Sequence, residues 1–277
     1  STMSRGLGDV YKRQVQDQTG KLLFLPVAPK RIISLVPSQT ELLYDLGLEQ
    51  EVAGITKFCI HPLQWYRTKQ RVGGTKQIEI DLVKSLQPDL VIANKEENVK
   101  EQVEAISSFC PVYTSDISTL EDTFHMIQNI GYITDTYERA DAIVHSITEK
   151  CATISIRPIG TALYLIWRNP IMAAGSDTFI SDMMRMAGFD NILEQVRYPQ
   201  LDETTLKNLQ PDFIFLSSEP YPFKENHVAE LKRICPLSKV ILVNGEFFSW
   251  YGSRLLQAAD YFAELRESLF LENNELI

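Results

Sequence analysis

The chain has 277 residues, 44% of them hydrophobic and 23% charged, which is typical of a globular protein with room for one large domain or two ordinary ones. Its formal net charge of −9 argues against nucleic acids and anionic membrane surfaces as partners. No apolar run approaches the roughly 20 residues that a transmembrane helix needs.

The first residues carry no sign of a folded element. Residues 1–14 lack the apolar region of a signal peptide and show no hydrophobic periodicity. We therefore expect residues 1–16 to be a disordered or foreign leader. No signal peptide is visible, so a cytoplasmic location is not excluded by the sequence.

The first half of the chain alternates short apolar strands with helices. A helix is predicted after Pro37, where Ser38 and Glu41 match a capping box, and it should end at Gly47. A further helical turn is predicted over residues 82–86. The predicted strands cover residues 31–36, 52–56, 90–93 and 112–115. This alternation indicates a mostly parallel sheet with helices on its faces.

The middle of the chain is predicted to be helical. Between residues 120 and 156, apolar side chains recur at helical spacing with few turn signals. Thr134-Asp135-Thr136 is expected to separate two helices and to cap the second. That second helix would have about 20 residues and a length of roughly 30 Å. A helix of this length can join two domains.

The second half repeats the alternation of strands and helices. Ser176-Asp177 is expected to cap a helix that ends at Ala187-Gly188. The predicted strands cover residues 161–167, 213–216 and 240–243, and an amphipathic helix closes the chain over residues 254–270.

One six-residue phrase occurs twice. Residues 84–89 (KSLQPD) and residues 207–212 (KNLQPD) share five of six residues at an offset of 123. Each phrase describes a short helix that stops at a proline and leads into a buried strand. The duplication predicts an α/β protein with two similar lobes, mostly parallel sheets and one long connecting helix. We expect an N-terminal lobe over residues 17–118, helices over 119–158 and a C-terminal lobe over 159–277.

Common enzyme motifs are absent, and we predict no catalytic residues. Aromatic and polar side chains instead gather directly after predicted strands, where an open α/β sheet binds its ligands. Such a surface suits a wide, flat, partly apolar ligand with polar edges. Each ring could alternatively pack one lobe against the other, and Arg168 and Arg254 could be ordinary ion-pair partners. These loops cover residues 57–67, 94–98, 167–170, 217–223 and 246–251.

Cys59 and His61 are weak candidates for metal ligation. Thiolate and imidazole bind soft transition metals, but a closed site needs four ligands and only these two are close in the sequence. His61 alone could be an axial ligand to a metal held in a macrocycle. The four cysteines contain no C-x-x-C pair, and we interpret them as buried thiols, with disulfides left open.

Several segments resemble the iron-complex and vitamin B12 substrate-binding proteins of ABC importers. The similarity covers roughly residues 17–267, including the central helix, and its motifs occur in the same order as in that family. The matching segments are residues 29–41 (PKRIISLVPSQTE), Val72-Gly73-Gly74, residues 86–93 (LQPDLVIA), Asn169-Pro170 with Gly175, and Gly252-Ser253-Arg254.

This resemblance implies the fold of class III periplasmic binding proteins, with a ligand held between two lobes that close little. It implies a monomeric, extracytoplasmic, non-enzymatic receptor without an intrinsic cofactor, which delivers its ligand to an ABC permease. The implied ligand is a metal chelate: cobalamin or a related tetrapyrrole such as haem, or a ferric siderophore. Two alternatives stay open, a cytoplasmic carrier of the same fold and a metal-dependent enzyme built on Cys59 and His61.

The resemblance also suggests individual site residues. Phe58 stands where cobalamin binders have a ring-stacking tyrosine, Tyr198 where they have a tryptophan and Met172 where they have a phenylalanine. Asn94 replaces a further tryptophan. The candidate ligand-binding residues are Pro37, Ser38, Phe58, His61, Lys95, Trp167, Arg168, Met172, Tyr198, Tyr221, Glu246, Phe247, Trp250 and Arg254.

Members of the family dock onto permease arginines through one acidic residue on each lobe. Asp81 occupies that place in the first lobe. In the second lobe the place holds Thr204, and Glu203 beside it is the candidate docking residue.

Overall fold

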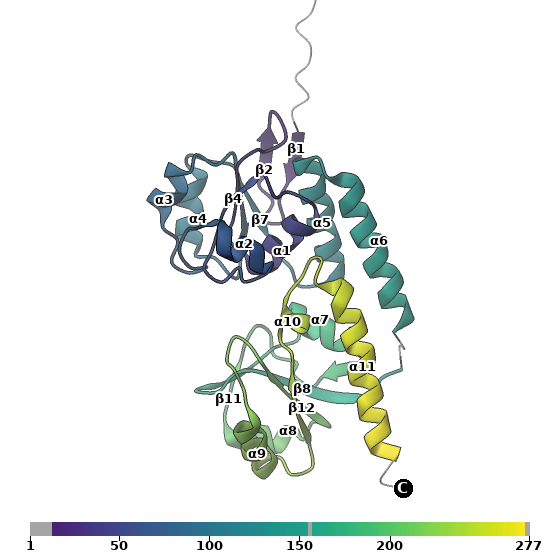
Figure 1. Ribbon diagram of the computed structural model, residues 1–277. Coiled ribbons are helices and arrows are strands. Elements are labelled where there is room, and N and C mark those ends of the chain that lie inside the picture. The colour runs from purple at the N-terminus through teal and green to yellow at the C-terminus, as the bar shows by residue number, and fades with distance from the viewer. Residues whose placement is uncertain (1–12, 155–156, 275–277) are drawn as a thin grey trace, which may run out of the picture. The chain divides into compact units, whose positions relative to one another are not determined.

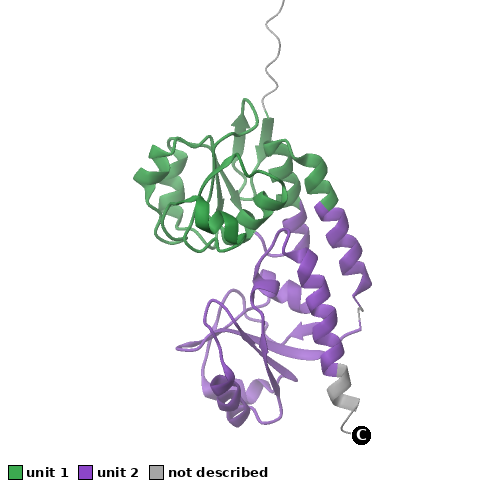
Figure 2. Cartoon of the chain, viewed as in Figure 1, with its two compact units in different colours: residues 1–116, 125–142 green, residues 117–124, 143–277 purple. Residues whose placement is uncertain are grey.

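The computed structural model describes residues 13–154 and 157–274. The chain divides into two compact units (Figure 2). Unit 1 comprises Ser1–Asp116 and His125–Ala142, and unit 2 comprises Ile117–Phe124 and Ile143–Ile277. No helix among the described residues is both long enough and apolar enough to cross a bilayer.

Unit 1 is built on a five-stranded sheet in the order β5-β4-β3-β6-β7, in which every pairing is parallel. Figure 1 labels β4 and β7 of this sheet. The strands are β3 (Ile32–Ser34), β4 (Val52–Ile55), β5 (Gln70–Arg71), β6 (Leu90–Asn94) and β7 (Val112–Ser115). The helices between them are α1 (Pro37–Asp45), α2 (Leu63–Thr68), α3 (Ile80–Ser85) and α4 (Lys100–Ser107). The strands predicted from the sequence are confirmed to within two residues at each end.

A separate hairpin precedes this sheet. β1 (Arg13–Gln16) pairs antiparallel with β2 (Leu22–Leu25), and the side chains of Val15, Leu23 and Leu25 are buried. The predicted leader over residues 1–16 is therefore wrong for its last four residues. Each strand has only four residues, so its alternation of buried and exposed side chains is too brief to read from sequence. Residues 1–12 lie outside the described part of the chain.

Helix α1 begins two residues earlier than the capping box predicts. Its N-cap is Val36, without a side-chain cap, and Pro37 is the first helical residue. Proline suits this position because its φ is already helical and the N–H it lacks would have no partner there. Ser38 lies inside the first turn and is buried. The predicted end is confirmed, because Gly47 follows with a φ of 80°.

Two helices connect the sheets. α5 (Leu120–Thr134) and α6 (Tyr137–Thr153) are separated at Asp135, whose φ is 66°, as the sequence predicts. α6 has 17 residues, somewhat fewer than expected. It is divided between the two units after Ala142.

Unit 2 has a mixed six-stranded sheet in the order β11-β9-β8-β12-β13, with β10 also paired to β8. β8, β10, β12 and β13 run parallel, whereas β9 and β11 pair antiparallel to their neighbours. The strands are β8 (Gly160–Trp167), β9 (Ile171–Ala173), β10 (Phe189–Asn191), β11 (Gln200–Leu201), β12 (Phe213–Ser217) and β13 (Lys239–Val243).

The helices of unit 2 are α7 (Phe179–Met186), α8 (Glu203–Leu209), α9 (Glu225–Ile234), α10 (Glu246–Ser249) and α11 (Leu255–Asn274). The cap predicted at Ser176-Asp177 is wrong by one residue. Thr178 is the N-cap, because its side chain accepts the N–H of Ser181. A hydroxyl and a carboxylate in neighbouring positions are both good caps, and sequence alone does not rank them.

The repeated phrase has the same structure in both units. Gln87 and Gln210 end α3 and α8 with positive φ values of 49° and 45°. The aspartate two residues later accepts backbone N–H groups at the start of the central strand. Asp89 accepts from Lys30 and Arg31 at 2.7 and 2.8 Å, before β3, and Asp212 accepts from Thr161 of β8 at 2.7 Å. The predicted α/β fold with two similar lobes and a long connecting helix is confirmed.

A second pair of contacts repeats as well. Arg139 of α6 donates to the carbonyl of Leu46 at 3.0 Å, where α1 ends, and Arg266 of α11 donates to the carbonyl of Ala187 at 2.9 Å, where α7 ends. Gly47 follows the end of α1 and Gly188 follows the end of α7, and both glycines have a positive φ. Since the last carbonyls of a helix lack partners within it, each guanidinium closes a helix end.

The glycine at this contact gives a stability prediction. A Cβ added to Gly188 would lie 1.6 Å from Arg266 Nη1, whereas one added to Gly20, which has nearly the same φ, would have its closest neighbour at 3.8 Å. Gly20→Ala should cost about 1–2 kcal/mol of unfolding free energy for the left-handed backbone. Gly188→Ala should cost about 1–3 kcal/mol more, because it also displaces a buried hydrogen-bonded guanidinium.

Urea unfolding of both variants measures this difference. Equal losses for Gly188→Ala and Gly20→Ala would show that the Arg266 contact does not contribute to stability.

Candidate functional site

The carboxyl ends of the strands of unit 1 form one edge of its sheet, because all the strands are parallel. Three candidate residues follow three adjacent strands at this edge. Pro37 comes after β3, Phe58 after β4 and Lys95 after β6. Ser38 and His61 belong to the same segments, so the structure brings all the predicted unit 1 residues to one edge.

Phe58 is the largest apolar side chain presented there. It is 51% exposed, and a Cβ added to Gly74 would lie 3.1 Å from its ring, so one ring edge rests on that glycine. The ammonium of Lys57 lies 5.2 Å from the ring centroid. Ile60 on the same loop and Leu63, the first residue of α2, are also exposed. The loop therefore presents an apolar surface with a cation beside it.

Beneath this edge the side chains form a buried polar layer. Cys59 receives a hydrogen bond from Thr40 at 3.0 Å and contacts Thr56 Oγ1 at 3.2 Å. Burial raises the pKa of Cys59 to about 11, so the thiol is protonated at neutral pH. Among the described residues no group of three or more His, Cys, Asp or Glu is placed to hold a metal ion. The structure therefore does not support Cys59 and His61 as a metal site.

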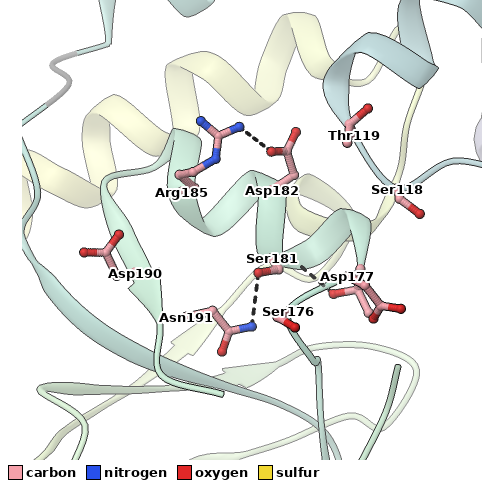
Figure 3. A pocket seen from close by; sticks show the side chains of 10 residues that line it. Ser118, Thr119, Ser176, Asp177, Ser181, Asp182, Arg185, Asp190 and Asn191 are labelled. Atoms are coloured by element: carbon pink, nitrogen blue, oxygen red, sulfur yellow. Dashed lines mark hydrogen bonds and ion pairs between the residues drawn. The ribbon is translucent and has the colours of Figure 1, made fainter. Parts of the chain in front are cut away.

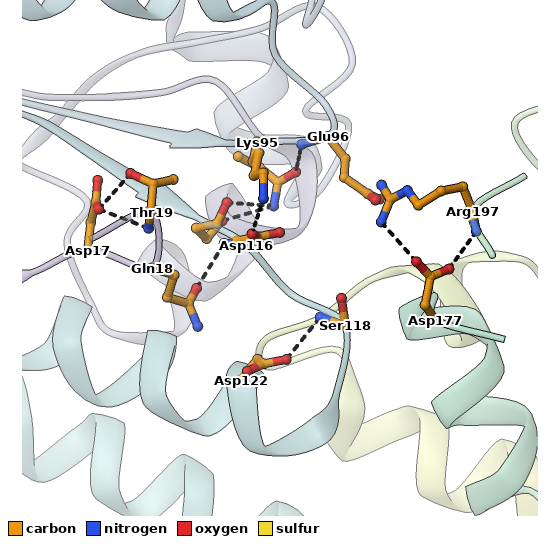
Figure 4. Close-up of polar contacts among 12 residues, drawn as sticks. Asp17, Gln18, Thr19, Lys95, Glu96, Asp116, Ser118, Asp122, Asp177 and Arg197 are labelled. Atoms are coloured by element: carbon orange, nitrogen blue, oxygen red, sulfur yellow. Dashed lines mark hydrogen bonds and ion pairs between the residues drawn. The ribbon is translucent and has the colours of Figure 1, made fainter. Parts of the chain in front are cut away.

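Lys95 is already paired within unit 1. Its ammonium lies 2.5 Å from Asp116 Oδ2, and the backbone N–H of Asp116 donates to Gln18 at 3.1 Å (Figure 4). Asn94, where cobalamin binders have a tryptophan, is buried and donates to Ser115. These contacts fix the end of β6 and use polar groups that the sequence left available for a ligand.

Unit 2 presents a comparable edge at the ends of β8, β12 and β13. Trp167 ends β8 and is 40% exposed, and its ring packs edge-on against Tyr221 with centroids 5.6 Å apart. Met172 lies in β9, and Tyr198 just precedes β11, the strand that pairs with β9. Both side chains are half-buried. The aromatic surface of this edge is therefore carried mainly by Trp167 and Tyr221.

Arg168 belongs to a structural ion pair. Its Nε donates to Glu230 Oε2 at 3.1 Å, and Nη2 contacts Oε1 of the same carboxylate. The hydrogen bond from Arg168 lowers the pKa of Glu230. This two-point contact ties the loop after β8 to α9.

Trp250 and Arg254 lie in a buried cluster around Glu219. Trp250 Nε1 and Ser249 Oγ donate to Glu219 Oε1 at 2.9 and 2.7 Å. The Arg254 guanidinium lies 5.1 Å from the Trp250 ring and 3.3 Å from Glu246 Oε2. Trp250 and Arg254 are each 7% exposed, so they support the loops of this edge from inside the unit. Phe247 stacks on Tyr261 with centroids 4.6 Å apart.

Glu219 is the residue that the candidate set missed. Its only signal in the sequence is that it lies 123 residues after Glu96, the same offset that separates the two copies of the repeated phrase. The partners of Glu219 are 30 and 31 positions away, so no local pattern identifies them.

One pocket in the described part of the chain lies within unit 2. It has a volume of about 480 Å³ and is lined by residues before α5, in and before α7, and in β10 (Figure 3). Asp182 pairs with Arg185, and Asn191 donates to Ser181 at 3.2 Å. None of the candidate ligand-binding residues lines this pocket, which is lined by polar residues and lacks aromatic rings. It is therefore a poor match for a flat apolar ligand.

The two docking candidates lie at the starts of corresponding helices, although Asp81 matches Thr204 in the repeat and Glu203 is one residue before it. Asp81 lies in the first turn of α3 and Glu203 in the first turn of α8, the helices that carry the repeated phrase. Both residues are exposed, and Glu203 pairs with Lys207 at 2.6 Å.

A known protein family matches most of this sequence. The model of a family described as "Periplasmic binding protein" matches residues 32–233. An uncharacterised ABC transporter substrate-binding lipoprotein of Bacillus subtilis, YvrC, is 27% identical over 220 residues, which cover 74% of this chain and 69% of that protein.

Two solved structures share the fold. The periplasmic vitamin B12-binding protein BtuF of Vibrio cholerae superposes with a TM-score of 0.73 at 22% identity, over 86% of this chain and 97% of that one. The periplasmic haem-binding protein HutB of Vibrio cholerae gives a TM-score of 0.71 at 22% identity, over 85% and 98%.

The buried carboxyl of Glu219 should make stability depend on pH. Burial raises its pKa, so it favours the folded state while protonated, and that contribution is lost as the pH rises through its folded pKa. Glu219→Gln keeps an acceptor for Ser249 and Trp250 but does not ionise. Relative to the original protein, this variant should gain stability from pH 4 to pH 8 in urea unfolding.

Glu230→Gln is the matched control with the opposite sign. The pKa of Glu230 is lowered, so its contribution is present above its unfolded pKa and lost at low pH. This variant should lose stability at neutral pH and approach the original protein near pH 3. The same pH trend in both variants would contradict the assignment.

The thiols should react slowly in the folded protein. All four cysteines are free, and burial raises the pKa of Cys110 to about 12 and that of Cys151 to about 11. At pH 8 only about one Cys59 in a thousand is then a thiolate. We expect four equivalents of Ellman's reagent to be consumed rapidly in denaturant and slowly without it. Rapid labelling of native Cys59 would contradict this.

Proposed function

Since the chain belongs to the periplasmic binding protein family, we propose that it is the substrate-binding protein of an ABC importer and that its ligand is a metal chelate. Proteins of this family carry solutes for transport and are not enzymes. The chelate is a transported substrate and not a resident cofactor.

One observation carries the assignment of the ligand class. Each unit exposes a large aromatic side chain where the central parallel strands end, Phe58 in unit 1 and Trp167 in unit 2. Flat aromatic faces suit a macrocycle. The cations that would favour an acidic siderophore, Lys95, Arg168 and Arg254, are each within 4 Å of a carboxylate of their own unit. We therefore place cobalamin or a related tetrapyrrole before a ferric siderophore.

The candidate residues divide into two roles in this proposal. The exposed and half-buried ones contact the ligand, and the buried or ion-paired ones hold the loops in place. The contact group is Pro37, Phe58, His61, Trp167, Met172, Tyr198 and Tyr221. The supporting group is Lys95, Arg168, Glu246, Trp250 and Arg254, together with Phe247, which is half-buried but stacked on Tyr261. Ser38, buried in the first turn of α1, belongs to neither group.

The proposal extends to partners and location. Asp81 and Glu203, exposed at matching helix starts, dock the protein onto the permease, with residues 17–118 and 159–277 as the two lobes. The protein acts outside the cytoplasm, in line with relatives described as periplasmic or as a lipoprotein, and we propose that it does so as a monomer.

Coloured ligands test the proposal directly. Hydroxocobalamin, haemin and a ferric hydroxamate siderophore are each incubated with the protein, and co-elution of colour and a rise in melting temperature are measured. Phe58→Ala and Trp167→Ala should each weaken binding about tenfold, because a buried aromatic anchor contributes about 1–3 kcal/mol.

Phe24→Ala is the matched control. Phe24 is 55% exposed on β2 of the separate hairpin. It is not part of the ligand-facing edge, which is the edge formed by the carboxyl ends of the sheet strands, so its truncation should leave affinity unchanged. If none of the chelates binds, or if Phe24→Ala weakens binding as much as Phe58→Ala, the proposed function is wrong.

A further inference from the structure

We propose that the ligand-facing edge of unit 1 contains an anion subsite, formed by the N-terminus of α1 with Ser38 and by Lys57. This inference rests on the proposed function and specifies its ligand as a chelate that carries a carboxylate or a phosphodiester. The subsite is separate from the aromatic contact of Phe58, because it recognises charge.

The N-terminus of α1 is available for an anion. The helix has nine residues, its N-cap is Val36 with no side-chain cap, and no acidic residue lies in its first turn. The first N–H groups of a helix have no acceptor within it and carry a partial positive charge. Anions bind such ends through these N–H groups. α1 presents them directly after β3, the central strand of the ligand-facing edge.

Ser38 supplies an independent reason to expect a ligand group there. The residue is 3% exposed, and its Oγ forms no hydrogen bond with any residue that the structure describes. Ser38 is the second helical residue, and helical side chains tilt toward the N-terminus, so its hydroxyl is directed at the uncapped end. Gln39 already donates its side-chain amide to Ser115, and its Oε1 is an acceptor that adds nothing to an anion site.

Lys57 supplies the charge. Among the described residues it forms no ion pair, and its ammonium contacts only the face of Phe58. Lys95, the other cation considered at this edge, is neutralised by Asp116. Lys57 is therefore a cation of this edge that can pair with a ligand.

The two parts of the subsite are joined through Cys59. Lys57 follows β4, the neighbour of β3, and the thiol of Cys59 accepts a hydrogen bond from Thr40 in the first turn of α1. The loop that carries Lys57 is thus packed against the helix end that carries Ser38.

A small anion tests the subsite without any chelate. Inorganic phosphate is titrated into ¹⁵N-labelled protein, and the amide signals of Ser38 and Gln39 are followed by NMR. We expect saturable shifts that weaken at least fivefold in Lys57→Met and persist in Lys21→Met, a control on the β1–β2 hairpin. Absence of shifts at Ser38 and Gln39, or equal shifts in both variants, would overturn the inference whatever the natural ligand is.

Matched chelates identify the anionic group. If it is a carboxylate, haemin should bind about tenfold more tightly than its dimethyl ester, and Lys57→Met should remove the difference. If it is a phosphodiester, cyanocobalamin should show the same advantage over dicyanocobinamide, which lacks that group. Equal affinities within both pairs would overturn the anion subsite and leave the proposed function intact, whereas no binding of any chelate would overturn the proposed function.

Discussion

An aspartate that accepts backbone N–H groups at the start of the central strand organises each unit. Asp89 does this for β3 and Asp212 for β8. Hydrogen bonds to a charged acceptor contribute about 1.5–3 kcal/mol each, more than a typical neutral bond. A strand that is fixed at its start also has its carboxyl end in a fixed place. Pro37 comes after the carboxyl end of β3, and Trp167 is the last residue of β8. The binding edge thus depends on a contact at the opposite end of the sheet.

Ion pairs within each unit explain which side chains each edge presents to a ligand. Arg168, Arg254 and Lys95 are paired with carboxylates of their own unit, so their charges position loops. What is left at the surface is mainly aromatic, Phe58 and Trp167, with Lys57 beside the first. A rigid, prearranged surface of this kind loses little conformational entropy on binding.

The sequence predicted most strands and helices, because their hydrophobic periods are local, and it predicted the paired lobes from the repeated phrase. It missed the hairpin strands β1 and β2, whose four residues each are too few to show a period, and the two- and three-residue strands β5, β9, β10 and β11. It also placed the start of α1 at Ser38, where Pro37 determines it. Ion pairs such as Arg168 with Glu230 join residues 62 positions apart and leave no local pattern. The residue types at the binding edge were therefore predictable, but not which of them already have partners.

Arg139 and Arg266 have a consequence for the completeness of each unit. Each donates to the carbonyl just before a glycine of positive φ, at the end of α1 or of α7. These contacts join residues 93 and 79 positions apart in the chain. A chain cut short before either arginine would therefore leave a helix end in the same unit without its partner.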